Sequence, residues 1–152
     1  MKSRKVFTAL FALLLVVGVC TSYATGAGEK PKSGGKEYVV YVVVHGGISH
    51  PFWKVVERGA EDVDALLPDL KVVYTGPDVY NFEQFMSIVD SSISAKPDGL
   101  ILTITSPEAM DQQLRRVIDQ LKIPVIAINA KDPRSIDKRI PYLSYVGESS
   151  YD

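Results

Sequence analysis

Short apolar runs rich in β-branched residues alternate along this chain with longer segments whose apolar residues recur at helical spacing. The first run, Tyr38–Val44, reads YVVYVVV, a pattern typical of a strand that is buried on both faces of a parallel sheet. Pro51–Leu67 follows and carries its charged residues opposite its apolar ones, which predicts an amphipathic helix. A strand that leads through a helix into another strand builds a parallel sheet.

The alternation continues to the end of the chain. A second helix is predicted from the N-cap Asn81, and a third from Ser106, which precedes a proline and an acidic residue. Further strands are predicted at Lys71–Thr75, Gly99–Thr103, Pro124–Asn129 and Leu143–Gly147. The predicted fold class is therefore α/β: a doubly wound, parallel five-stranded sheet with helices on both faces and right-handed crossovers.

Helical spacing also predicts which side chains face the core. On the first helix these are Phe52, Val55, Val56, Gly59, Ala60, Val63 and Leu67, and on the third they are Met110, Leu114, Val117, Ile118 and Leu121. Trp53 lies one position off this stripe, which favours exposure at the rim of the sheet.

The first residues have the pattern of an export signal. Lys2–Lys5 carry three positive charges and precede the apolar run Val6–Val19, which is shorter than the about 20 residues that span a bilayer. We predict a signal peptide at 1–24, a flexible linker at 25–36 and a folded domain at 37–152, located in the periplasm or otherwise outside the cytoplasm.

Cys20 is the single cysteine, so the chain can form neither an internal disulfide nor a thiolate metal cluster. Its place after the apolar run allows a lipid anchor, but Val19 is a poor match to the small residue that usually precedes a lipidated cysteine. Plain secretion is favoured over the lipid anchor, and an uncleaved anchor is the third alternative. The net charge of −1 becomes −4 without the N-terminal cations, which disfavours binding to nucleic acid; membrane contact is expected only through a lipid on Cys20.

Ligands of open parallel sheets bind at the carboxyl ends of the strands, near the point where strand order reverses. The loops there contain aromatic rings for the apolar face of a sugar and polar groups for its hydroxyls. The candidate binding residues are His50, Phe52, Trp53, Asp78, Thr105, Asn129 and Lys131, with Asp132 as a further acceptor. Structural alternatives stay open: Phe52 can belong to the core, Asp78 can cap a turn, and His45 is expected to make a local hydrogen bond.

Catalytic patterns are missing from these loops. There is no dinucleotide fingerprint, P-loop or G-x-S-x-G motif, and the two histidines lie five residues apart without a third metal ligand nearby. We therefore predict a protein that is not an enzyme and uses no cofactor or metal.

Four segments, YVVYVVVHGGISHPFWKVVERGAE, KPDGLILTITSPEAM, LKIPVIAINAKDP and SYVGESSYD, resemble type I periplasmic solute-binding proteins of the ribose-binding family. TGPDVYN is also similar to the autoinducer-2 and rhamnose-binding branch. The resemblance covers Glu37 to Asp152 and implies the first lobe of a two-lobed protein, with the second lobe absent. We therefore expect a fragment or a half-site, weak ligand affinity and an apolar surface along the hinge edge.

The same resemblance implies roles for individual residues. Phe52 and Trp53 match the aromatic pair that stacks on or encloses the sugar, and Asn129 matches the polar residue that ends the fourth strand. His50 stands where the family often has an asparagine, and Lys131 lies where an arginine is usual, so the identity of the ligand stays open.

The resemblance implies a protein that binds a sugar or sugar-like solute and delivers it to the permease of an ABC transporter. The alternative is a sensory protein that presents an autoinducer-type ligand to a membrane receptor or kinase. An enzyme on a doubly wound fold is less favoured. A regulator of the lac-repressor type is disfavoured by the export signal, which occupies the position of a DNA-binding domain.

Overall fold

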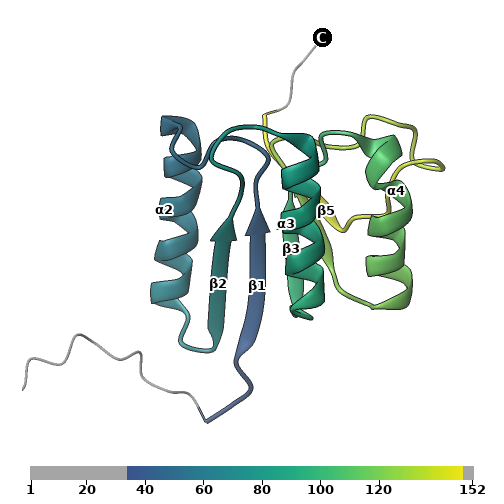
Figure 1. The fold of residues 1–152 in the computed structure, drawn as a ribbon. Coiled ribbons are helices and arrows are strands. Elements are labelled where there is room, and N and C mark those ends of the chain that lie inside the picture. The colour runs from purple at the N-terminus through teal and green to yellow at the C-terminus, as the bar shows by residue number, and fades with distance from the viewer. Residues whose placement is uncertain (1–33, 149–152) are drawn as a thin grey trace, which may run out of the picture. The chain divides into compact units, whose positions relative to one another are not determined.

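The computed structural model describes residues 34–148, and they form a five-stranded sheet in the order β2-β1-β3-β4-β5 with every neighbouring pair parallel (Figure 1). The strands are β1 (Tyr38–Val43), β2 (Leu70–Thr75), β3 (Gly99–Leu102), β4 (Val125–Ile128) and β5 (Ser144–Val146). The helices are α2 (Pro51–Leu66), α3 (Phe82–Ser94), α4 (Pro107–Arg115) and the π-helix η1 (Arg116–Gln120). The predicted α/β class and its five parallel strands are confirmed.

The predicted signal peptide, Cys20 and residues 25–33 of the predicted linker lie outside the described residues. Those predictions, and the boundary of the folded domain at residue 37, stay predictions. Between residues 34 and 148, no helix combines the length and the apolar character needed to cross a membrane.

β1 lies next to the point where the strand order reverses. Val40 pairs with Val72 of β2 on one side and with Gly99 of β3 on the other. The chain therefore leaves β1 for one neighbour and later crosses back past it to the other. Because all strands are parallel, the loops that follow β1, β2, β3 and β4 meet at one edge of the sheet.

The side chains of β1 and β3 alternate between two apolar clusters. Val43, Leu100 and Leu102 pack with α3 and α4 in the larger cluster, whereas Val42 and Val44 pack with Trp53 of α2 in the smaller one. The alternation follows from the period of two along a strand. The sheet is thus buried on both faces around β1 and β3, as the apolar runs predict.

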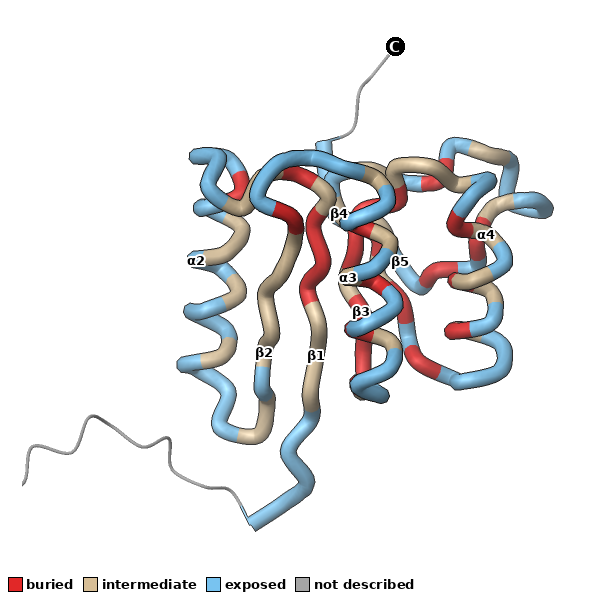
Figure 2. The backbone as a smooth tube through the Cα atoms, in the orientation of Figure 1, coloured by how far each residue is buried: buried red, intermediate tan, exposed pale blue. Residues whose placement is uncertain are grey.

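The apolar stripe of α2 is mostly exposed, in contrast to the prediction that it faces the core. Val55 is 73% exposed, Val63 41% and Leu67 50%, and Trp53 is the one buried residue of the helix; Figure 2 shows most of α2 as exposed or intermediate. The physical reason is that α2 is the one described helix in the smaller cluster. An apolar groove of about 320 Å³ therefore runs between α2 and the sheet, lined by residues such as Val63 and Ile101. The apolar surface expected along the hinge edge stays a prediction.

The third helix changes its winding near its end. Met110, Leu114 and Val117 are buried as predicted, but α4 continues into η1, where the Leu121 N–H donates to the carbonyl of Arg116 at 3.1 Å. A π-turn is wider than an α-turn and rotates the residues that follow it. The predicted inward position of Leu121 is wrong, since this side chain is 44% exposed.

Alanine substitution of two leucines, one buried and one exposed, compares how much the buried and the exposed apolar side chains contribute to stability. Leu114 is fully buried and Leu66 is 76% exposed. We expect Leu114→Ala to lower the free energy of unfolding by about 3 kcal/mol, because it leaves a cavity in the larger cluster, and Leu66→Ala to change it by less than about 0.5 kcal/mol. Urea titrations followed by circular dichroism measure both values. Equal losses in the two variants would contradict this assignment of the core.

Candidate ligand-binding site

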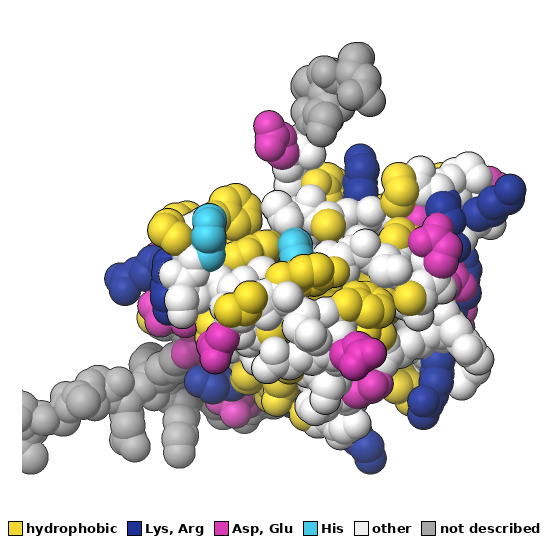
Figure 3. Space-filling view, turned by 45° about the horizontal axis from the view of Figure 1, so that its top comes forward, with side chains coloured by type: hydrophobic (Ala, Val, Ile, Leu, Met, Phe, Trp, Pro, Cys, Tyr) yellow, Lys and Arg dark blue, Asp and Glu magenta, His cyan; other side chains and the backbone are white. Residues whose placement is uncertain are grey.

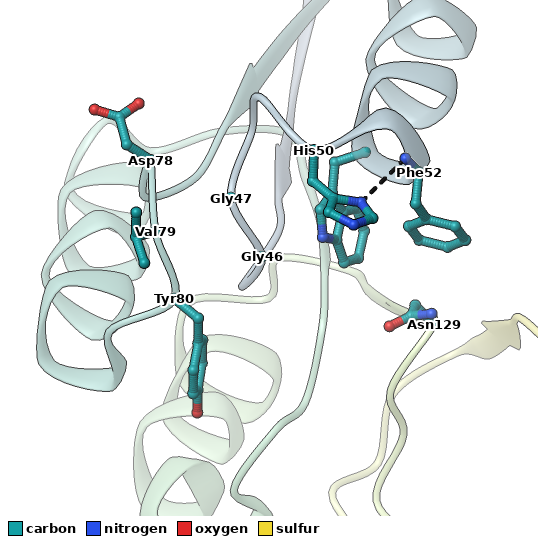
Figure 4. A pocket seen from close by; sticks show the side chains of 9 residues that line it. Gly46, Gly47, His50, Phe52, Asp78, Val79, Tyr80 and Asn129 are labelled. Atoms are coloured by element: carbon teal, nitrogen blue, oxygen red, sulfur yellow. Dashed lines mark hydrogen bonds between the residues drawn. The ribbon is translucent and has the colours of Figure 1, made fainter.

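A cavity of about 530 Å³ opens at the carboxyl edge of the sheet, where the loop after β1, the loop after β2 and the end of β4 converge. The side chains around it include His50, Phe52, Trp53, Asp78, Tyr80 and Asn129. Figure 4 shows Phe52 and Tyr80 on opposite sides of the opening, with Asn129 below Phe52. In the view that brings this edge forward, hydrophobic side chains gather beside both histidines (Figure 3).

Two adjacent glycines allow the loops to pack this closely. A Cβ on Gly46 would lie 1.7 Å from the indole nitrogen of Trp53, and one on Gly47 would lie 2.4 Å from the carbonyl oxygen of Asp78. Either substitution would displace a wall of the cavity. Gly46-Gly47, which the sequence presents only as a tight turn, therefore brings the loops after β1 and β2 together.

The two aromatic residues that begin α2 lie at different depths. Trp53 is 6% exposed and belongs to the smaller apolar cluster, whereas Phe52 is 49% exposed. The predicted rim exposure of Trp53 is wrong, because its indole reaches past Gly46 into the core. For Phe52 the core alternative is excluded. Trp53 forms the floor of the cavity, and Phe52 forms a wall.

Four aromatic rings follow one another edge to face across the site. Phe52 and Trp53 have centroids 4.8 Å apart, Trp53 and His45 5.3 Å, and His45 and Tyr80 5.5 Å, with interplanar angles of 86°, 81° and 89°. These are favourable aromatic geometries. We call these four rings the aromatic series.

His45 does not make the local hydrogen bond that the sequence led us to expect. Its Nδ1 is buried and has no hydrogen-bond partner in the described part of the chain. Burial lowers the pKa of this imidazole below its ordinary value of 6.5, because the charged form loses hydration. The ring is therefore neutral at pH 7.

His50 has a structural function that the sequence did not predict. It is the N-cap of α2, and its Nδ1 accepts a hydrogen bond from the Phe52 N–H at 3.2 Å. A nitrogen that accepts carries no proton, so the neutral ring has its proton on Nε2. That leaves one N–H at the cavity wall to donate to a ligand.

Asn129 reaches the cavity through an unusual backbone conformation. Its φ is 59°, in the left-handed region that asparagine tolerates better than most residues. Its N–H donates to Val146 at 3.0 Å and its carbonyl accepts from the Tyr145 hydroxyl at 2.8 Å. Both bonds hold the turn, and the amide side chain is left free to line the cavity.

Three other predicted site residues contribute less to this cavity. Asp78 lines it, but Figure 4 shows its carboxylate pointing away from the other side chains drawn. Lys131 places its ammonium 4.9 Å from the ring centroid of Tyr145 and does not line the cavity. Thr105 is also outside the lining, although its Oγ1 is buried without a partner in the described chain, as is that of Thr103. No group of three or more potential metal ligands occurs in residues 34–148.

Comparison with known proteins agrees with this topology. A model of the periplasmic binding protein domain matches residues 40–152. The chain belongs to this family. No curated protein sequence matches it.

Solved structures of such binding proteins share the fold. The periplasmic sugar-binding protein of an ABC sugar transporter from Legionella pneumophila is 26% identical, with a TM-score of 0.61 over 72% of this chain. The glucose-galactose binding protein from Geobacillus stearothermophilus is 25% identical, with a TM-score of 0.64 over 74% of this chain. A carbohydrate transporter from Acidothermus cellulolyticus, solved with myo-inositol, is 23% identical with a TM-score of 0.59 over 72%, which shows the fold alone.

The chain spans 36–38% of the length of these three structures. It corresponds to the first lobe of the periplasmic binding proteins, as the sequence resemblance implies.

Asp132 of this binding-protein lobe is not a ligand acceptor, although its sequence position suggests one. Its carboxylate is fully buried and accepts from the Arg134 guanidinium at 2.7 Å and from the Ile140 N–H at 2.8 Å. Arg134 also binds Asp111 of α4 at 2.7 Å. The network ties the β4–β5 connection to α4 and leaves Asp132 no free oxygen for a sugar.

The Arg134 guanidinium and the backbone N–H groups of Ile140 and Arg134 lower the pKa of Asp132 from 3.8 to about 2. Because the folded pKa is the lower one, the stabilisation is present above pH 4 and is lost as the pH falls towards 2. We expect Asp132→Asn to lose about 2 kcal/mol at pH 7 and much less at pH 2. Urea titrations of both proteins from pH 2 to 7 measure this; parallel curves would contradict it.

Proposed function

We propose that this lobe binds a neutral sugar or polyol outside the cytoplasmic membrane and, within a two-lobed binding protein, delivers it to the permease of an ABC transporter. The observation that carries the proposal is the half-exposed ring of Phe52 at the carboxyl edge of the sheet, beside the N–H of His50 and the amide of Asn129. An aromatic face next to mixed donors and acceptors suits a ring that has apolar C–H faces and hydroxyls.

The charges around the cavity favour a neutral ligand. Among the described residues that line the cavity, Asp78 is the one carboxylate and there is no lysine or arginine; the Asp78 carboxylate points away from the other side chains drawn in Figure 4. His50 donates while neutral, through the proton on Nε2. A phosphorylated or carboxylated sugar would find no cation here to compensate its charge.

The relatives support the class of ligand and the setting. The two structures with the highest identities above are described as a sugar-binding protein of an ABC transporter and as a glucose-galactose binding protein. Periplasmic binding proteins work outside the cytoplasmic membrane, which fits the predicted export signal at residues 1–24. A binding role also fits the catalytic patterns missing from these loops, so we propose that the protein is not an enzyme.

Saturation-transfer NMR suits this test, because it detects the weak binding expected of one wall of a cleft. We expect transfer to D-glucose, D-galactose or myo-inositol from the wild-type chain, and none to glucose 6-phosphate. Phe52→Ala and Asn129→Ala should each weaken binding about three- to tenfold, since each removes one contact worth about 1 kcal/mol.

Val55→Ala is the matched control, since Val55 is a 73% exposed residue of α2 that does not line the cavity. It should bind as the wild type does. The proposed function would be contradicted if no neutral sugar or polyol received transfer from the wild-type chain, or if the charged sugar were preferred.

A further inference from the structure

His50 caps α2 with a side chain that can accept the capping hydrogen bond only while it is neutral. The Nδ1 of its imidazole accepts from the Phe52 N–H at 3.2 Å (Figure 4). Most N-caps are serine, threonine, aspartate or asparagine, whose oxygens still accept at mildly acidic pH. We propose that His50 is a proton-sensitive positioning residue, which holds the first turn of α2 in its ligand-binding arrangement while neutral and releases it when protonated. The inference rests on the proposed function and adds a dependence on pH to it.

The capped N–H has no substitute acceptor within the helix. The first N–H groups of a helix lack intrahelical partners. Pro51 has no N–H, and the Phe52 N–H is bonded to the His50 ring. The first bond within the helix runs from the Lys54 N–H to the His50 carbonyl at 3.1 Å. Protonation places a hydrogen on Nδ1, which then faces the Phe52 N–H as donor to donor, so the cap is lost.

The charge added by protonation is also unfavourable at this end of α2. A helix N-terminus carries a partial positive charge, which a cation destabilises. The first turn of α2 contains no acidic residue to compensate it. Among residues 34–148, no carboxylate forms an ion pair with His50. The ring is exposed, so protons reach it from solvent. The lost bond and the new charge therefore both act against the capped turn.

The other charged and phenolic groups around the cavity belong to three segments. On α2, Lys54 is paired with Glu57 at 2.6 Å. In the β2–α3 loop, Asp78 and Tyr80 line the cavity. After β5, Glu148 lines an adjoining cavity. Carboxyl groups ordinarily titrate near pH 4, and phenols and ammonium groups near pH 10. A change between pH 5 and 8 therefore points to a histidine.

His45 is the other histidine of the chain. Its ring lies against those of Trp53 and Tyr80, with centroids 5.3 and 5.5 Å away. Burial lowers the pKa of His45 below 6.5, so it gains its proton at a more acidic pH than an imidazole in water. A variant that retains His45 and lacks the His50 imidazole separates the two histidines.

The first turn of α2 carries two sides of the cavity. Trp53 is held by its packing in the smaller apolar cluster and by the Tyr74 hydroxyl, which donates to its carbonyl at 3.1 Å. Phe52 is 49% exposed and its N–H is bonded to the cap itself. Loss of the cap should therefore displace Phe52 more than Trp53. Because the protonated ring keeps its Nε2 N–H, a bound sugar would lose the contact with Phe52 rather than the donor.

The pH response of the wild type and of His50→Asn tests this inference. We expect D-glucose to bind about fivefold more weakly at pH 5 than at pH 7.5 in the wild type, which is the usual contribution of an N-cap. Asparagine caps helices without titrating, so the two affinities of His50→Asn should agree within about twofold. His50→Ala should bind weakly at both pH values. Dissociation constants from saturation-transfer NMR titrations of the full chain measure these ratios.

Asp78→Asn is the matched control, because it removes a titratable group from the same cavity lining and leaves the cap intact. It should keep the wild-type ratio of affinities between the two pH values.

A measurement without ligand follows the cap itself. In ¹H–¹⁵N spectra recorded from pH 5 to 8, the Phe52 amide should move with the same midpoint as the signals of the His50 ring. The amide of Gly99, at the start of β3, should stay in place. In His50→Asn the Phe52 amide should no longer move with pH.

The outcomes separate the two proposals. A His50→Asn variant that keeps the wild-type pH response, or a wild type that binds glucose equally or more tightly at pH 5, would refute the role of His50 while the proposed function stands. A Phe52 amide that does not respond while the His50 ring titrates would also refute it. If the wild type binds no neutral sugar at either pH, the proposed function is contradicted, and the ligand-free spectra still decide whether protonation of His50 releases the turn.

Discussion

The parallel pairing of β1 with both of its neighbours is the constraint on which the rest of the structure depends. Val40 lies in register with Val72 on one side and with Gly99 on the other, so the strand order reverses beside β1. Parallel strands end at a common edge, and the loops that leave β1, β2 and β4 meet there around one cavity. The position of the cavity is therefore a consequence of strand order.

Trp53 connects this framework to the chemistry of the site. Its indole packs against Val42 and Val44 in the smaller apolar cluster and at the same time forms the floor of the cavity. The Tyr74 hydroxyl donates to the Trp53 carbonyl at 3.1 Å and so ties the first turn of α2 to β2. Rings placed on such a supported residue are held in position before a ligand arrives, which reduces the entropy lost on binding.

The sequence predicted the elements of the fold well, because β-branched runs and helical spacing depend on local pattern. It also predicted the edge at which the cavity opens and the capping role of Asn81, whose side chain accepts from the Gln84 N–H at 2.8 Å. It could not predict how deeply each aromatic side chain is buried. Trp53 is buried and its neighbour Phe52 is exposed, and the difference depends on the space left by Gly46. The sequence did not indicate that Tyr80 lines the cavity, because its ring partner His45 lies in another loop.

The central claim is that the carboxyl edge of the sheet holds the ligand against the aromatic series. An ¹H–¹⁵N correlation spectrum recorded during titration with D-glucose tests it directly, because the single tryptophan gives one unambiguous indole signal. We predict that the Trp53 indole and the backbone amides of Gly47 and Tyr80 shift with a common saturation curve, while Gly99 at the start of β3 does not move. Shifts confined to Gly99 and its edge of the sheet, or a Trp53 signal that stays in place while others saturate, would contradict the account.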